Sequence, residues 1–186
     1  MQKIKENLIN ENETNTDLKE QLELCIKEVK TEFENMKICS LNNENSVKCF
    51  EYFNSEDNFI IIMELCDTNL SKVLTDRILK NGKGFYSEEI LEILNQLNNI
   101  FKVMKEKKII HRDLKLENIL IKYKDKEDKK YIIKLSDYGC SKRLTEILES
   151  KGEKEEYYYN YKCDLWSIGI IIYKLYFGKF PYSGES

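Results

Sequence analysis

The sequence predicts an α+β fold with one sizeable core, because stretches of helical periodicity alternate with short apolar runs of strand length. Apolar side chains recur every three or four residues in 17–36 and in 87–104, and residues 165–177 are apolar almost throughout. Two shorter apolar runs, at 58–66 and 131–135, have the length of buried strands. A chain of 186 residues with 41% hydrophobic side chains can bury one such core and a small second lobe.

Composition and charge exclude several classes of protein. The formal net charge of -3 and the lack of a basic stripe argue against a nucleic-acid-binding protein. The largely apolar stretch 165–177 has 13 residues, too few to cross a bilayer, so no membrane association is expected. The six cysteines contain no Cys-x-x-Cys pair, and the first residues are too polar for a signal peptide. We therefore expect reduced thiols in an intracellular, cytoplasmic protein.

The first predicted helix covers residues 17–36. Asp17 with Glu20 three residues later resembles a capping box, which marks a helix start. The helix then carries one apolar stripe, formed by Leu18, Leu22, Cys25, Val29, Phe33 and Met36.

A strand and a second helix follow. The run 58–66, NFIIIMELC, predicts a buried strand, and Val47 fits the start of the strand before it. Ser87 is the predicted N-cap of the second helix, with Glu88 and Glu89 in its first turn. Its apolar stripe consists of Ile90, Leu94, Leu97, Phe101 and Met104.

Residues 109–118, IIHRDLKLEN, carry the chemistry. They place a carboxylate, an ammonium group and an amide on one short segment, at Asp113, Lys115 and Asn118. Phosphoryl transfer asks a protein for positioning and charge compensation more than for covalent chemistry, and these three groups on one rigid loop suit it.

A second short motif follows the apolar run 131–135. Ser136-Asp137-Tyr138-Gly139 is by itself only a turn signal. Gly139 is expected to supply the backbone freedom that the turn needs, and the Tyr138 hydroxyl needs a partner if its ring is packed. The charged segment 122–130 predicts a solvated turn between two strands.

The last predicted helix, 165–177, is apolar nearly all round, which predicts burial on every side. Gly178 ends it, and Pro181, the only proline in the chain, indicates that the helix does not resume at once.

Together these motifs resemble the eukaryotic protein kinase family of serine/threonine type. His-Arg-Asp-Leu-x-x-x-Asn at 111–118 resembles its catalytic loop, Asp-Tyr-Gly at 137–139 its metal-binding motif, and 162–182 the central helix of its C-terminal lobe. The resemblance implies a protein-kinase-like fold with a truncated N-terminal lobe and a mainly helical, C-terminally truncated C-lobe. Residues 1–16 are then a polar extension and 17–186 a partial kinase domain, with 17–66 in the N-lobe and 67–186 in the C-lobe.

The resemblance also implies catalytic roles. Asp113 accepts the proton of the attacking hydroxyl, and Lys115 lies near the transferred phosphate, as in serine/threonine-directed members. Arg112 belongs to the same catalytic motif, while Asn118 and Asp137 are expected to hold Mg²⁺.

For ATP, the resemblance implies a second set of residues. Met63 guards the back of the adenine pocket, the backbone of Glu64 and Cys66 faces the adenine edge, and Leu120 contributes to nucleotide binding. Glu34 falls where the family keeps the glutamate of its regulatory helix, which pairs with a strand lysine.

Two further contacts are expected from the resemblance. Asp164 hydrogen-bonds the backbone of the catalytic loop, and Tyr138, which replaces the family's usual Phe, packs near His111.

Three family features are missing from this sequence. No glycine precedes Gly82, so there is no glycine-rich loop before 58–66. Lys27 resembles the strand lysine, but on one helix it lies seven residues, about 10 Å, from Glu34, and a surface lysine is the favoured interpretation. The family's activation loop and substrate-docking turn are also missing after Gly139. Either the chain passes from Leu144 or Thr145 directly to the stretch that begins at Glu146, or residues 146–152 are a remnant of the loop, and the docking turn is lost in both cases.

A further gap is at the end of the sequence. It stops just after Pro181, which predicts uncovered apolar surface on the last helix and on the helix 87–104, and a protein partner that covers it.

Two functional hypotheses follow. The first is a protein serine/threonine kinase that uses ATP and Mg²⁺ on a protein substrate. The second is a catalytically impaired kinase fragment or a pseudokinase-like interaction module, because losing the phosphate clamps costs several orders of magnitude in rate.

Overall fold

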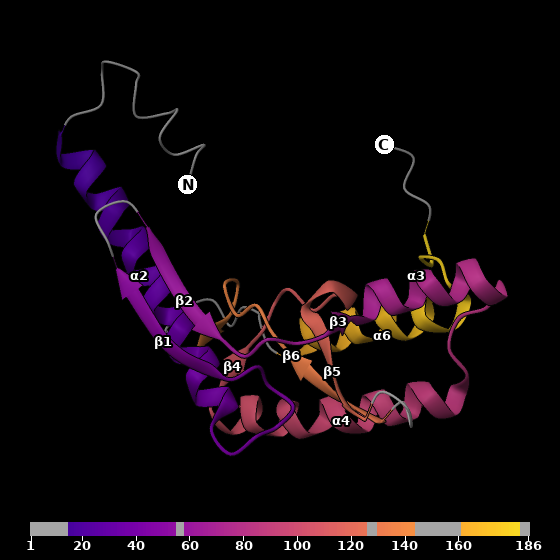
Figure 1. Ribbon diagram of the computed structural model, residues 1–186. Helices are drawn as coiled ribbons and strands as arrows, with labels where there is room; N and C mark the ends of the chain where they lie inside the picture. Colours follow the sequence, from indigo (N-terminus) through magenta and orange to yellow (C-terminus); the bar gives the residue numbers. More distant parts are fainter. Residues whose placement is uncertain (1–14, 55–57, 126–129, 144–160, 183–186) are drawn as a thin grey trace.

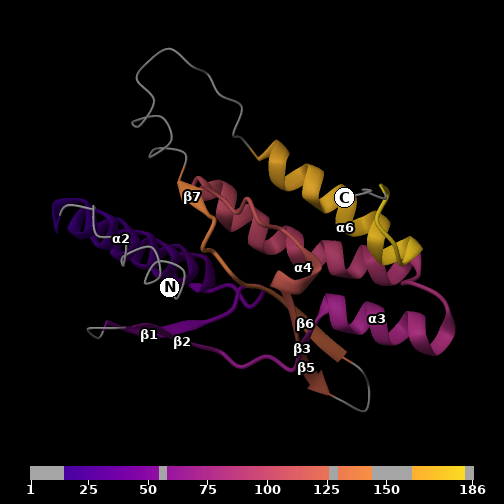
Figure 2. The same ribbon diagram turned by 90° about the horizontal axis from the view of Figure 1, so that it is seen from above.

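The computed structural model describes residues 15–54, 58–125, 130–143 and 161–182 (Figure 1). At one end, helix α2 (Asn15–Ser40) lies alongside the hairpin of strands β1 (Cys49–Asn54) and β2 (Phe59–Met63). At the other end, helices α3 (Leu70–Asn81), α4 (Ser87–Glu106) and α6 (Lys162–Phe177) lie together. In Figure 2, α2 and its hairpin lie to one side of the three other helices, and α2 contacts α4. The predicted α+β class is confirmed.

The predicted helix 17–36 is confirmed as part of α2, but it packs only along its second half. Asn35, Met36 and Cys39 are buried, and the Phe33 ring lies 5.2 Å from the ring of Tyr52 in β1. Leu22, in the predicted stripe, is 58% exposed. The side chains of residues 15–20, which include the expected capping box, lie outside the described residues.

The strand at 58–66 is confirmed as β2 between residues 59 and 63, where it pairs antiparallel with β1. It is not the buried strand that its apolar sequence predicts, because Ile60, Ile62 and Met63 are all exposed. The preceding strand begins at Cys49 and not at Val47, although the Val47 amide already donates a 2.9 Å hydrogen bond to the Leu135 carbonyl.

The core forms between α4 and the hairpin of β5 (Ile119–Asp125) and β6 (Lys130–Leu135). This hairpin confirms the two strands expected around 122–130; residues 126–129 lie outside the described part. Short strand β3 (Thr68–Asn69) extends the sheet, and β4 (Ile109–Ile110) pairs separately with β7 (Lys142–Arg143). Helix α4 buries Ile90, Ile93, Leu97, Ile100 and Met104, so two members of its predicted stripe, Leu94 and Phe101, are only half-buried.

The start of α4 differs by one residue from the prediction. The N-cap is Tyr86 and Ser87 is the first helical residue. The carboxylate of Glu89 accepts a 2.8 Å hydrogen bond from the Tyr86 amide, and it also binds Arg77 of α3. A carboxylate in the first turn therefore performs the capping that the sequence assigned to a serine hydroxyl.

Helix α6 ends as predicted, because Gly178 adopts the left-handed conformation (φ 72°) and its amide donates to the Lys174 carbonyl. The expected burial on every side is wrong. Leu165 is 66% exposed and Trp166 67%, whereas Ile171 and Leu175 of the same helix are buried. The predicted uncovered apolar surface on this helix is thereby confirmed. Within the described residues no helix is long and apolar enough to cross a membrane.

Candidate active site

The segment after β4 is held in place by a carboxylate from α6. The backbone amides of His111 and Arg112 each donate a 2.9 Å hydrogen bond to a different oxygen of Asp164, which is only 7% exposed. This confirms the contact expected for Asp164. Arg112 adopts φ 67°, which a non-glycine residue rarely does without support from its surroundings. Its Nε also donates a 2.6 Å hydrogen bond to the Cys140 carbonyl.

His111 and Tyr138 form the buried base of the site. Their rings lie 5.1 Å apart, which confirms the expected packing, and the Tyr138 hydroxyl lies 3.0 Å from Ser46 Oγ. Burial lowers the pKa of His111, so the imidazole is held neutral. Its Nε2 lies 3.1 Å from the Ser136 carbonyl, which makes Nε2 the protonated nitrogen.

The side chains of Lys115 and Asn118 converge on the carboxylate of Asp113. Lys115 Nζ donates a 2.5 Å hydrogen bond to Asp113 Oδ2, and this bond raises the pKa of Lys115. Asn118 Nδ2 donates to the same carboxylate oxygen at 3.1 Å and to the Asp113 carbonyl at 2.9 Å. The amide nitrogen is therefore engaged, and the amide oxygen is left to face another partner.

The residue of this turn with left-handed backbone conformation is Asp137 and not Gly139, for which the sequence predicted backbone freedom. Asp137 adopts the left-handed conformation (φ 63°), whereas Gly139 does not. A Cβ at Gly139 would meet its neighbours at ordinary contact distance, so the expectation that this turn needs glycine freedom is wrong. The Gly139 amide points to Asp137 Oδ1 at 3.4 Å.

Glu32 is a site residue that the sequence interpretation missed. Its carboxylate and that of Asp137 both lie 3.4 Å from the position of a Cβ on Gly139, so the two acids flank this glycine. Burial raises the pKa of Glu32, and the charge of Asp137 raises it further. The helical phase of α2 contained the signal, because Glu32 lies four and seven residues before the buried Met36 and Cys39.

Glu34 and Lys27 lie elsewhere. The Glu34 side chain is 48% exposed, and its charged neighbour is Arg143, with Nη2 at 3.6 Å. Lys27 is exposed on α2, which agrees with its interpretation as a surface lysine. The structure therefore does not bring Glu34 to the site and does not pair it with a lysine among the described residues.

A hydrogen-bond chain fixes α2 against the segment after Gly139. Asn35, fully buried, donates from Nδ2 to Ser141 Oγ at 3.0 Å and accepts from Arg143 Nε at 3.0 Å. Ser141 in turn donates to the Tyr138 carbonyl at 2.6 Å. This chain positions Glu32 beside Asp137.

The expected nucleotide-binding segment follows β2. Met63 ends the strand, and the Glu64 amide donates to the Lys48 carbonyl at 2.8 Å. Burial acts to raise the pKa of Glu64, but hydrogen bonds from Lys122 (2.6 Å) and Lys134 (3.0 Å) outweigh it and lower the pKa. Cys66 is half-buried, as is Leu120 at the start of β5.

Lys134 has an unusual position, because its side chain is only 3% exposed. Its ammonium group also donates to the Glu44 carbonyl at 2.7 Å, so the buried charge is fully paired. The Glu64, Lys122 and Lys134 cluster ties the segment after β2 to the β5–β6 hairpin. The sequence signal for this cluster was Lys134 itself, a charged residue inside the apolar run 131–135.

The donor set fits a magnesium ion. Among the described residues the Asn118 amide oxygen has no hydrogen-bond partner, and the Asp137 carboxylate accepts only the long bond from Gly139. Mg²⁺ prefers such oxygen ligands and is commonly held by one or two carboxylates together with phosphate oxygens and water. In the described part of the chain no three acidic, imidazole or thiol side chains gather at one point, so these side chains alone do not form a complete metal site.

The protein kinase domain is the family whose model matches this chain, over residues 8–186. The chain therefore belongs to the protein kinase family. Among curated proteins it is 33% identical over 159 residues to calcium-dependent protein kinase 4 of Plasmodium falciparum, covering 78% of this chain and 28% of that protein. It is 30% identical over 169 residues to a CDPK-related protein kinase of Daucus carota, covering 86% and 27%.

A third relative is the 3-phosphoinositide-dependent protein kinase B of Dictyostelium discoideum, 33% identical over 186 residues, covering 87% of this chain and 19% of that protein. The chain thus spans between about a fifth and little more than a quarter of the length of these curated relatives.

Proposed function

We propose that the chain is the catalytic part of a protein serine/threonine kinase, which transfers the γ-phosphate of ATP to a hydroxyl of a protein substrate in the cytoplasm. The observation that carries the proposal is the convergence of Lys115 and Asn118 on the Asp113 carboxylate, on a loop tied to Asp164. Family membership and the serine/threonine kinases among its relatives support it.

Each side chain has a defined task in this proposal. Asp113 orients the substrate hydroxyl and accepts its proton, while Lys115 compensates charge on the phosphate as it moves. Arg112 ties the loop to the segment after Asp137 through the Cys140 carbonyl. Bound Mg²⁺ supplies charge neutralisation for the ATP phosphates, and Asn118 and Asp137 are its proposed ligands.

The adenine side of the proposal rests on the segment after β2. Met63, the backbone of Glu64 and Cys66, and Leu120 are proposed to contact the base. The ion pairs of Glu64 with Lys122 and Lys134 support this, because they hold that backbone against the hairpin that carries Leu120.

We also propose that Glu32, and not Glu34, is the glutamate of α2 that contributes a carboxylate to the site. Glu32 lies beside Asp137, is half-buried, and has no lysine within ion-pair distance among the described residues. Mg²⁺ usually keeps several water molecules, and a hydrated ion at Asp137 would lie within reach of a second carboxylate on this side.

A second candidate function is nucleotide binding without phosphate transfer. The ion pair of Glu34 with Arg143, in place of one with a strand lysine, favours it. Both candidates require Mg·ATP binding, and only the kinase transfers phosphate.

Binding is tested by thermal unfolding with and without Mg·ATP. A ligand at 100 times its Kd stabilises a protein by about 2.7 kcal/mol, which gives a readily measured rise in Tm. We expect this rise to shrink in Asp137→Asn and to persist in Asp76→Asn, an exposed residue of α3. A Tm that millimolar Mg·ATP leaves unchanged would exclude both candidates.

A further inference from the structure

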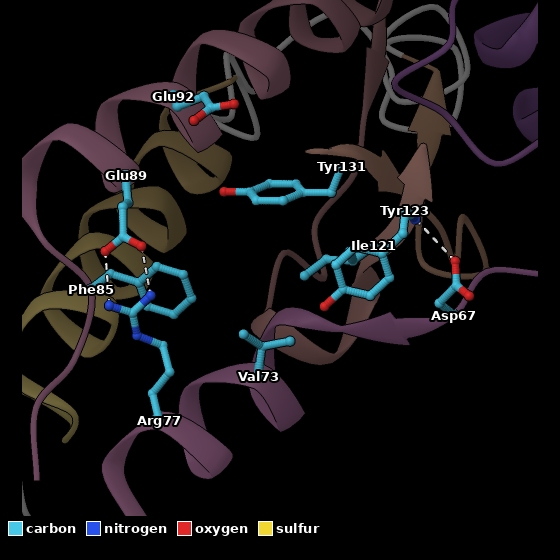
Figure 3. A pocket seen from close by; sticks show the side chains of 9 residues that line it. All are labelled: Asp67, Val73, Arg77, Phe85, Glu89, Glu92, Ile121, Tyr123 and Tyr131. Carbon is cyan, nitrogen blue, oxygen red and sulfur yellow. Dashed lines mark hydrogen bonds and ion pairs between the residues drawn. The ribbon is translucent and has the colours of Figure 1, made fainter. Parts of the chain in front are cut away.

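A cavity of about 760 Å³ lies between α3, α4 and the β5–β6 hairpin, on residues that the proposed kinase chemistry does not use (Figure 3). Its volume is within the range of small-molecule sites, roughly 300–1,000 Å³. The lining combines apolar, aromatic and charged side chains. It consists of Asp67, Val73, Arg77, Phe85, Glu89, Glu92, Ile121, Tyr123 and Tyr131.

The one cation in this lining is already neutralised. Arg77 donates from both terminal nitrogens to Glu89, at 2.6 and 2.9 Å, and its guanidinium lies 4.4 Å from the centre of the Phe85 ring. This bidentate pair matches the charge of Arg77, although its Nε has no hydrogen-bond partner among the described residues. The charge that remains in the cavity is therefore acidic.

Glu92 supplies the acceptor that is still available. Within the described parts of the chain its carboxylate has no hydrogen-bond or ion-pair partner. Asp67 adds a second negative charge and accepts a 3.0 Å hydrogen bond from the Tyr123 amide. A cation entering the cavity thus meets the carboxylate of Glu92, since Glu89 is matched by Arg77.

Two tyrosines complete the site. Tyr123 and Tyr131 are directly paired across the hairpin, and Figure 3 shows the Tyr131 side chain reaching across the cavity toward Glu89 and Glu92. Burial, followed by the charges of Glu92 and Glu89, raises the pKa of Tyr131 to about 12, so its hydroxyl stays protonated. Tyrosine ring faces attract ammonium groups.

We propose that this cavity binds an organic cation, an ammonium group on an apolar stem. The ammonium group lies against Glu92 and the tyrosines, and the stem lies against Val73, Phe85 and Ile121. Free amines and the lysine side chain of a peptide both have this chemistry. The site goes beyond the proposed kinase function and does not depend on it.

The test is calorimetric titration of the whole chain with 2-phenylethylammonium, and with 2-phenylethanol as its neutral counterpart. We expect the amine to bind and the alcohol to bind at least several-fold more weakly. Glu92→Gln should weaken amine binding about three- to fivefold, the size expected of an ion pair open to solvent. The matched control Glu88→Gln, exposed on the same helix but outside the cavity, should bind the amine like the parent chain.

A second variant, Val73→Phe, occupies the cavity from α3 and should abolish amine binding while leaving the cooperative unfolding transition intact. Titration with N-acetyl-phenylalanyl-lysine amide distinguishes the two sources of the cation. Tighter binding of this peptide than of the amine indicates a peptide lysine, and the reverse order indicates a free amine. The proposal is overturned if neither probe binds at millimolar concentration. It is equally overturned if amine and alcohol bind alike, or if Glu92→Gln behaves like Glu88→Gln.

Discussion

At the scale of single residues, sequence spacing located the reacting groups better than it located their supports. Asp113, Lys115 and Asn118 lie within six positions of one another, so the spacing alone brings them together. Glu32 reaches Asp137 only because α2 packs with one particular rotation against the segment after Gly139. That rotation depends on tertiary contacts. The expectation for Glu34 rested on its position in the sequence, which contains no information on these contacts.

The rotation of α2 predicts different effects for two similar substitutions. We expect Glu32→Gln to weaken Mn²⁺ binding, used as a probe of the Mg²⁺ site, by about tenfold, as for removal of a carboxylate beside a metal ligand. Glu34→Gln should leave Mn²⁺ affinity unchanged, because its side chain is exposed and paired with Arg143. Metal titration in the presence of saturating ADP, followed by electron paramagnetic resonance, measures both.

Equal Mn²⁺ affinity in the Glu32→Gln and Glu34→Gln variants would show that Glu32 does not contribute to the metal site. It would leave the kinase proposal standing, since Asp113 and Asp137 do not depend on Glu32.

At the scale of elements, the sequence located the helices and strands but not which of their faces is covered. Both α6 and β2 are apolar enough to be buried on all sides, yet Trp166 and Ile60 are exposed. Hydrophobicity records what an element can bury, whereas burial requires a neighbour on that side. The ends of elements were predicted where glycine determines them, as at Gly178, and missed by one residue where a carboxylate caps the helix, as at Glu89.

The junction of α3 and α4 gives an element-scale prediction. Glu89→Gln removes the charge that caps α4 at the Tyr86 amide and that pairs with Arg77. We expect a loss of about 1–2 kcal/mol in the free energy of unfolding, measured by urea denaturation. Glu92→Gln, on the same helix and without an ion-pair partner in the described part of the chain, should change the free energy of unfolding by less than about 0.5 kcal/mol. Equal effects of the two substitutions would show that the Arg77–Glu89 contact does not stabilise the junction.

At the scale of the whole molecule, one buried imidazole couples global stability to pH. His111 is the only histidine of the chain and is fully buried, and burial lowers its pKa. The folded state therefore binds fewer protons than the unfolded state below the ordinary histidine pKa of about 6.5. The contribution of His111 to stability is complete above that pH and is lost as the pH falls below it.

The pH dependence is measured as the difference between the parent chain and His111→Gln. Chemical denaturation between pH 5 and pH 8 should show the parent losing stability relative to the variant as the pH falls below about 6.5. Parallel stability curves for the two proteins would contradict a neutral, buried His111.

The central claim is that the loop around Asp113 transfers phosphate to protein hydroxyls. The most direct measurement is transfer of the labelled γ-phosphate of ATP to a serine- and threonine-containing protein by the purified chain. The account predicts Mg²⁺-dependent labelling of serine or threonine that falls by orders of magnitude in Asp113→Asn and persists in Asp76→Asn. Labelling that Asp113→Asn leaves intact, or no labelling by a chain that binds Mg·ATP, would contradict it.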